Sequence, residues 1–235
     1  MTPATGRGIS VAIIDSGVHP RHPHIDAARL AGGVAIDREG RIDDAPHALL
    51  DRLGHGTAVT AAIQERAPDA GLLTVRVFHD ALRASAAALI AAIRWSIAAR
   101  ADIVNLSLGS TNAAHRDAFA AVTAEAAAAG VLIVAARTAG DGPCWPGALP
   151  DVLGVELDWD CPRAAWRIAR APNAVRAAGY PRPIEGIAPT RNLHGVSFAV
   201  AQVTGIATCI AQRIDATAPP DRRAALMSAI LAGAD

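Results

Sequence analysis

Three side chains in this sequence are of the types that together activate a nucleophile: Asp15, His55 and Ser197. Asp15 ends an apolar run and is followed by Ser-Gly, His55 stands in the sequence Gly-His-Gly-Thr, and Ser197 lies between Val196 and Phe198. In such a set, a carboxylate orients an imidazole, and the imidazole takes the proton of a hydroxyl that attacks a carbonyl carbon. The chemistry to expect is acyl transfer through a covalent intermediate.

Each of these residues also has an ordinary structural interpretation. Asp-Ser-Gly is common in turns, and a serine or a His-Gly-Thr sequence often begins a helix. The order Asp, His, Ser, with each residue at the boundary of an expected element, favours the catalytic interpretation over three unrelated turns and caps. Because the three residues are far apart in the chain, only the fold could bring them together.

The elements expected around these residues are short apolar runs that alternate with longer helical stretches. Strands are predicted at 10–14, 71–77, 102–108, 131–136 and 152–156, and helices at 55–64, 84–99, 113–129, 197–213 and 221–231. This alternation predicts a three-layer α/β fold, a mainly parallel sheet with helices on both faces. The length predicts one domain over residues 1–235. Active sites of such sheets gather at the carboxyl ends of the strands, where Asp15 would lie.

Composition excludes several classes of partner. The chain has 235 residues and zero formal net charge, and all 22 of its basic residues are arginine, so neither nucleic acid nor an anionic membrane is expected. The longest apolar run, 126–136, is too short to span a bilayer as a helix. No secretory leader opens the sequence, which predicts a cytoplasmic protein. The three cysteines form no metal-binding pair, and a bridge between Cys144 and Cys161 is an open alternative to three free thiols.

The motifs together resemble those of subtilases, the subtilisin-like serine peptidases, along nearly the whole chain. Residues 15–17, 54–57 and 195–199 resemble the family's Asp, His and Ser motifs, and residues 101–109 resemble the strand that lines its substrate cleft. The resemblance implies that Asp15, His55 and Ser197 form the catalytic triad. It also implies that Ser107, Leu108 and Gly109 bind an extended peptide through their backbone, which is sequence-independent recognition by strand addition.

The sequence departs from the family at the oxyanion hole, where subtilases supply an asparagine side chain. Without a gap the asparagine position falls on Ala139, whereas two inserted residues place Asp141 there, and Thr138 is a third candidate donor. The backbone N–H of Ser197 would remain in each case. A protonated Asp141 could donate to an oxyanion, while an ionised one would repel it. Losing one donor slows turnover by about 10²–10³-fold without abolishing it.

No metal or other cofactor is expected. The segment between the helix of the His motif and the next strand is only residues 65–70, so the family's calcium-binding loop is expected to be deleted, and His24 stands where the resemblance implies an acidic calcium ligand. His19, His22 and His24 are close enough in sequence to suggest a metal site, but solvated loop histidines are the more ordinary interpretation.

The expected function is that of a serine endopeptidase that cleaves peptide or protein substrates through an acyl-enzyme on Ser197. A weakened oxyanion hole favours selective intracellular processing over general digestion. Two alternatives stay open: a weakly active or inactive subtilase-like module that binds peptides, and a hydrolase that uses the same triad on an ester or amide of a small metabolite.

Overall fold

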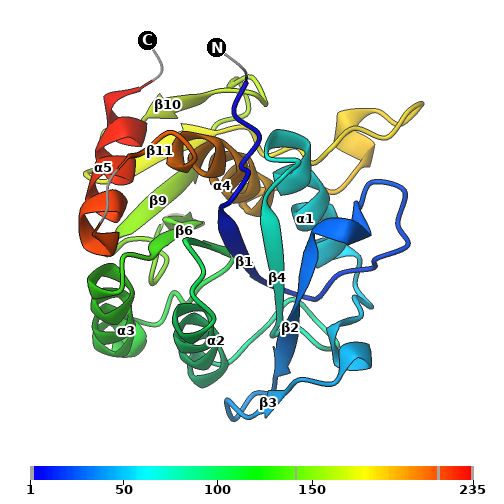
Figure 1. Ribbon diagram of the computed structural model, residues 1–235, viewed down its shortest axis with the longest axis horizontal. Coiled ribbons are helices and arrows are strands. Elements are labelled where there is room, and N and C mark those ends of the chain that lie inside the picture. Colours follow the sequence, from blue (N-terminus) through cyan, green and yellow to red (C-terminus); the bar gives the residue numbers. More distant parts are fainter. Residues whose placement is uncertain (1–2, 141, 216–217, 234–235) are drawn as a thin grey trace.

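The computed structural model describes residues 3–140, 142–215 and 218–233, which form a large twisted sheet between two layers of helices (Figure 1). The nine strands of the sheet lie in the order β10-β11-β9-β6-β5-β1-β4-β2-β3. The seven strands from β11 to β2 run parallel, and β10 and β3 pair antiparallel at the two edges. This architecture confirms the three-layer α/β fold predicted from the sequence.

The strands are β1 (Ser10–Asp15), β2 (Leu30–Ile36), β3 (Ile42–Asp43), β4 (Gly71–Arg76), β5 (Ile103–Leu106), β6 (Leu132–Ala136), β9 (Val152–Leu157), β10 (Trp166–Ile168) and β11 (Ala174–Ala177). A separate two-stranded hairpin consists of β7 (Thr138–Ala139) and β8 (Gly142–Pro143). The helices are α1 (His55–Arg66), α2 (Ala86–Ala98), α3 (Arg116–Ala128), α4 (Val196–Ala211) and α5 (Pro219–Ala232). Short 3₁₀ turns are η1 (Ala27–Arg29), η2 (Pro46–Leu49), η3 (Ala113–His115) and η4 (Pro189–Arg191).

The strand β1 illustrates why the central strands form. Its residues alternate between the two faces of the sheet, as the period of two in a strand requires. Val11 and Ile13 belong to the hydrophobic cluster that α1, α4 and α5 cover, whereas Ala12 and Ile14 belong to the cluster that α2 and α3 cover. A strand buried on both faces must be apolar throughout, which is the pattern that made these strands predictable.

The sequence did not predict β2, β3, β10 or β11. The strand β2 contains two adjacent glycines and an irregular register against β4, so it lacks an uninterrupted apolar run. The strands β3 and β10 are short and lie at the edges of the sheet, where side chains are exposed and the apolar pattern is weak. The strand β11 is a four-residue segment that contains an exposed arginine.

The connections place a reversal of strand order at β1. From β1 the chain passes to β2 and β4 on one side, and then to β5 and β6 on the other side. Crevices at such switch points, at the carboxyl ends of the strands, are where α/β sheets bind ligands. Asp15 is the last residue of β1 and therefore lies at this point. No helix within the described residues is both long and apolar enough to cross a membrane.

Candidate active site

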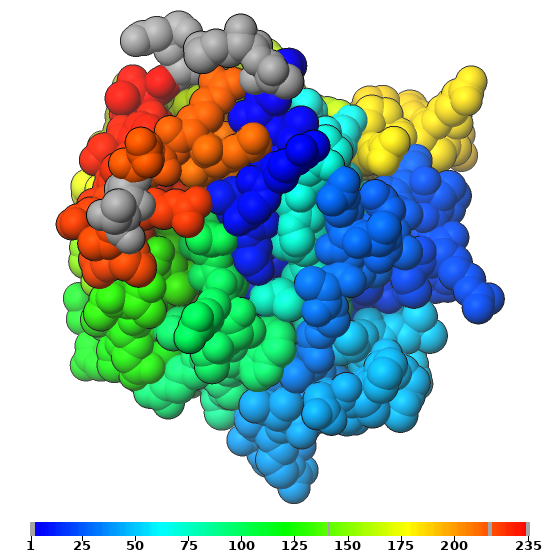
Figure 2. Space-filling model, in the orientation of Figure 1, coloured from blue at the N-terminus to red at the C-terminus, as the bar shows by residue number. Residues whose placement is uncertain are grey.

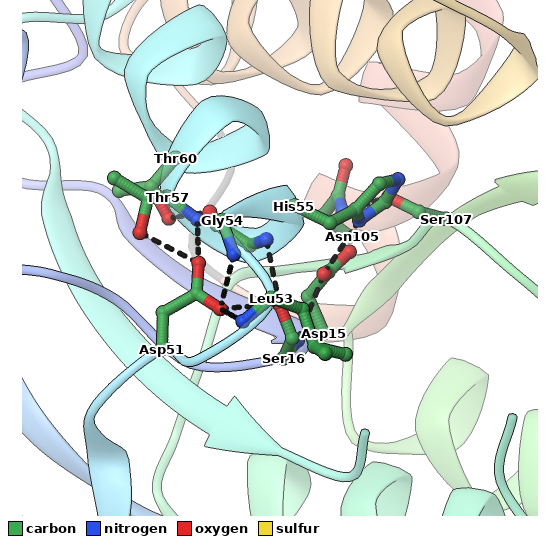
Figure 3. Close-up of polar contacts among 11 residues, drawn as sticks. Asp15, Ser16, Asp51, Leu53, Gly54, His55, Thr57, Thr60, Asn105 and Ser107 are labelled. Carbon is green, nitrogen blue, oxygen red and sulfur yellow. Dashed lines mark hydrogen bonds and ion pairs between the residues drawn. The ribbon is translucent and has the colours of Figure 1, made fainter. Parts of the chain in front are cut away.

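Asp15 and His55 lie in direct contact at the end of β1 (Figure 3). The Oδ1 atom of Asp15 lies 2.7 Å from Nδ1 of His55 and also accepts the backbone N–H of Ser16 at 2.8 Å. Asp15 is fully buried, and its second carboxylate oxygen has no hydrogen-bond partner among the described residues. The carboxylate is therefore held on one oxygen by a backbone donor and by the imidazole.

His55 is the first residue of α1, and the helix begins there because Gly54 adopts a left-handed conformation before it. The side chain is buried, and burial by itself would lower its pKa. The hydrogen bond and negative charge of Asp15, together with the charge of Asp51, outweigh this effect and raise the pKa above its ordinary value. The protonated imidazole is therefore stabilised by these carboxylates, as a general base that must accept a proton requires.

Asp51 organises the start of α1, although the sequence did not single it out. Its carboxylate is 8% exposed and accepts five hydrogen bonds, at 2.6–2.9 Å, from the Ser16 hydroxyl, the Leu53 and Gly54 N–H groups, and both the N–H and the hydroxyl of Thr57. Burial would raise the pKa of Asp51, but the bonds from Thr57, Leu53 and Ser16 lower it overall. Asp51 thus stays ionised and is a positioning residue for the helix that carries His55. The sequence signal that could have identified Asp51 is an aspartate shortly before the start of a predicted helix.

The turn after Asp15 approaches the start of α1 very closely. A Cβ atom on Gly17 would lie 2.3 Å from the carbonyl oxygen of Leu49, and a Cβ on Gly56 would lie 2.3 Å from the carbonyl oxygen of Gly17. The hydroxyl of Ser16 also accepts the N–H of Gly56 at 2.8 Å while it donates to Asp51. Backbone contact and hydrogen bonding together set the separation of the carboxylate and the imidazole.

Ser197 is the second residue of α4, which packs against α1, and the residue is 7% exposed. The ring of the next residue, Phe198, lies against the His55 imidazole with 5.6 Å between ring centroids. Among the described residues, no hydrogen bond joins Ser197 to His55. The structure therefore brings the start of α4 to the imidazole without forming the third contact of a triad, a contact that often tightens only when substrate binds.

The segment Ser107 to Gly109 follows β5 and is held at both ends. The buried amide of Asn105 donates to the Ser107 hydroxyl at 3.0 Å and accepts the Thr204 hydroxyl of α4 at 2.9 Å. Beyond the segment, Ser110 exchanges two backbone hydrogen bonds of 2.8 Å with Trp145. Asn105 was not recognised from the sequence because an amide inside an apolar strand does not indicate which element it contacts.

Of the oxyanion candidates, Thr138 and Ala139 lie in β7, and Ser197 lies at the start of α4. Thr138 is half-buried in β7, and its hydroxyl makes no hydrogen bond to another described residue. Ala139, the ungapped alternative, is exposed, and Asp141 lies outside the described residues. The N–H of Ser197 is among the first backbone donors of α4, which have no partner within a helix.

Cys144 and Cys161 are both buried free thiols, not a disulfide. Burial raises the pKa of Cys144 to about 11, which leaves its thiol protonated and unreactive at neutral pH.

Within the described part of the chain, no three His, Cys, Asp or Glu side chains are grouped so as to hold a metal ion, and this includes His19, His22 and His24.

The model of the subtilase family, peptidase S8, matches residues 6–155. The chain belongs to the subtilase family. This confirms the resemblance predicted from the motifs, and it supports a serine-type peptidase.

Individual subtilase relatives differ in how much of their length this chain spans. The subtilisin-like protease het-Q2 of Podospora anserina is 37% identical over 121 residues, which are 48% of this chain and 32% of the relative. The intracellular serine protease of Paenibacillus polymyxa is 27% identical over 231 residues, 90% of this chain and 69% of the relative. The thermostable alkaline protease of Halalkalibacterium halodurans is 29% identical over 232 residues, 88% of this chain and 58% of the relative. The chain thus spans less than two thirds of two of these relatives.

Among solved structures, a cold adapted subtilisin-like serine proteinase superposes with a TM-score of 0.71. The match covers 96% of this chain and 83% of the other at 20% sequence identity. At this identity the similarity establishes the fold.

Proposed function

We propose that the protein is a serine endopeptidase with Asp15, His55 and Ser197 as its catalytic triad. Ser197 Oγ attacks the carbonyl carbon of a peptide bond while Nε2 of His55 takes the hydroxyl proton. The imidazolium returns this proton to the leaving nitrogen as the C–N bond breaks, which leaves an acyl-enzyme. Water then attacks the ester by the same proton route and releases Ser197.

The contact of 2.7 Å between His55 Nδ1 and Asp15 Oδ1 carries this proposal. A carboxylate oxygen accepts, so Nδ1 carries the hydrogen and Nε2 keeps the lone pair that a general base needs. The ring also lies against Phe198, the neighbour of Ser197, so the start of α4 is beside the imidazole. The raised pKa of His55 supports the same assignment.

The remaining roles are stabilisation of the oxyanion and binding of the substrate backbone. The oxyanion would be stabilised by the N–H of Ser197 together with either the Thr138 hydroxyl or a protonated Asp141. Ser107, Leu108 and Gly109 would pair with an extended substrate, since the chain on either side of them is fixed by Asn105 and by the bridge between Ser110 and Trp145.

A selective role in intracellular peptide processing follows from the atypical oxyanion hole. A side-chain donor other than asparagine predicts slow turnover, which suits a dedicated substrate better than general digestion. The name of the Paenibacillus relative, an intracellular serine protease, supports a cytoplasmic location. Efficient cleavage of casein at many sites would contradict this part of the proposal.

A peptide-binding module without hydrolytic activity is the second candidate. Two observations favour it: no hydrogen bond joins His55 and Ser197 among the described residues, and the oxyanion asparagine is absent. Such a protein would bind a peptide along residues 107–109 but would not form an acyl-enzyme.

A fluorophosphonate probe separates the two candidates because it labels only an activated serine. We expect labelling of the wild-type chain and of a Ser228→Ala control, in which an exposed serine on α5 is replaced. Labelling should be lost in Ser197→Ala. Absence of labelling in the folded wild-type protein would reject the peptidase and support the binding module.

A further inference from the structure

A cavity of about 300 Å³ adjoins the candidate active site on the side of α1. It lies between the loop that follows β1, the start of α1, and the segment 180–194, which projects from the body of the molecule (Figure 2). It is lined by Gly54, which precedes His55, by Thr57, two residues after His55, and by Leu193, four residues before Ser197. A side chain of a peptide bound at the triad could therefore enter this cavity.

The walls of the cavity carry an excess of positive charge. Arg52 and Arg182 line it together with His19, His22 and His24. Neither arginine forms an ion pair with a carboxylate in the described part of the chain, and Arg182 donates only to the backbone carbonyl of His24 at 3.2 Å.

The carboxylates of Asp51 and Glu65 are already engaged. Asp51 is the acid among the lining residues, and its carboxylate accepts five hydrogen bonds from the loop and helix around it. Glu65 pairs with Arg163 instead of with Arg182. Burial lowers the pKa of His24, and the charges of Arg182 and His22 lower it further, against a smaller opposite effect of Glu65. The space beside His24 is therefore electropositive.

We propose that this cavity binds a carboxylate of the peptide substrate, so that the protein selects acidic peptides. A guanidinium that lacks a carboxylate partner in the protein forms strong charge-assisted hydrogen bonds with a carboxylate of a ligand. The exposed side chains of Ile184 and Leu193 offer an apolar rim for the methylene groups of a glutamate. The carboxylate could belong to an acidic side chain or to the C-terminus of a short peptide. This substrate class rests on the proposed peptidase function.

The test is peptide binding to the Ser197→Ala chain, measured by fluorescence anisotropy. Three kinds of short labelled peptide are compared: amidated peptides in which one glutamate is moved along an otherwise neutral sequence, the same peptides with glutamine, and the glutamine peptides with a free C-terminus. We expect at least about tenfold tighter binding of a peptide that carries a carboxylate, the effect of about 1.4 kcal/mol. Tighter binding of the glutamate peptides would show that the cavity binds an acidic side chain. Tighter binding of the peptides with a free C-terminus would show that it binds the terminal carboxylate.

Substitutions locate the site. Arg182→Gln and, separately, Arg52→Gln should reduce the preference severalfold, while Arg191→Gln, an exposed arginine of the same projecting segment, should leave it unchanged. Arg52 makes no hydrogen bond with another described side chain, so its replacement should not disturb folding. Equal binding of charged and neutral peptides, or a preference that survives both substitutions, would overturn the proposal. Failure of the peptidase function is distinguishable, because the wild-type chain would then fail to react with the fluorophosphonate whatever the binding result.

Discussion

Replacing Asp51 with asparagine tests whether this carboxylate positions the helix that carries His55. The amide has the shape of the carboxylate but only one oxygen. That oxygen can keep the three bonds now made to Oδ1, from Ser16, Leu53 and Gly54. The amide nitrogen then faces Thr57, whose hydroxyl can reverse and accept but whose N–H cannot. One buried donor is therefore left without a partner.

The size of the effect follows from these contacts. A buried unsatisfied donor costs about 1–3 kcal/mol, and each retained bond becomes weaker when its acceptor loses its charge. Because these terms are not additive, we expect Asp51→Asn to lower the free energy of unfolding by about 2–4 kcal/mol. For a chain of this length, that corresponds to a melting temperature lower by roughly 5–15 °C.

Calorimetry of Asp51→Asn should be compared with Asp44→Asn, which removes the same charge from an exposed position in the preceding loop. A positioning role also predicts a change in the pH profile. The charge of Asp51 contributes to the raised pKa of His55, so the acid limb of kcat/KM should move to lower pH in Asp51→Asn and not in the control. If the two variants have the same melting temperature, and the acid limb of kcat/KM lies at the same pH in both, Asp51 neither stabilises the helix start nor influences His55.

Three further predictions concern the triad and the oxyanion hole. Asp15→Asn should lower kcat by about 10⁴-fold, because an amide at the Asp15 position favours the wrong imidazole tautomer, and a loss below tenfold would exclude the triad. In the wild-type protein, activity should rise through a pKa above the ordinary histidine value of about 6.5, and an acid limb at lower pH would contradict the raised pKa of His55. The same shift stabilises the fold below about pH 6.5, and this stabilisation is lost as the pH rises through the folded-state pKa of His55. Thr138→Val should reduce kcat by about 10²–10³-fold with little change in KM if the hydroxyl stabilises the oxyanion, and unchanged kinetics would leave that role to Asp141.

Much of the fold could be predicted because buried parallel strands leave a strong local signal. The run that contains Val11 and Ile13 is apolar at every position, since helices cover both of its faces. The same reasoning located β4, β5, β6 and β9 and the five long helices to within a few residues. It failed for β2, whose pairing with β4 is set by the neighbouring strand and not by its own glycine-containing sequence.

In the candidate site, too, some features could be predicted from the sequence and others depend on the fold. The identities and chain order of Asp15, His55 and Ser197, and the absence of an asparagine from residues 131–142, are properties of the sequence alone. The sequence pattern could not show that Asp51 would accept five hydrogen bonds. The donors come from Ser16, from the loop before α1 and from α1 itself, and only folding brings them to one carboxylate.

The charged cavity depends still more on tertiary structure. Arg52 and Arg182 are far apart in the chain, and each resembles any other arginine of an exposed segment. They share one cavity because the segment 180–194 lies beside the loop after β1, where Arg182 donates to the carbonyl of His24. Local sequence thus determined which chemical groups the protein has and which elements carry them. The three-dimensional packing of those elements decided which groups meet, since contacts between distant segments depend on the whole fold.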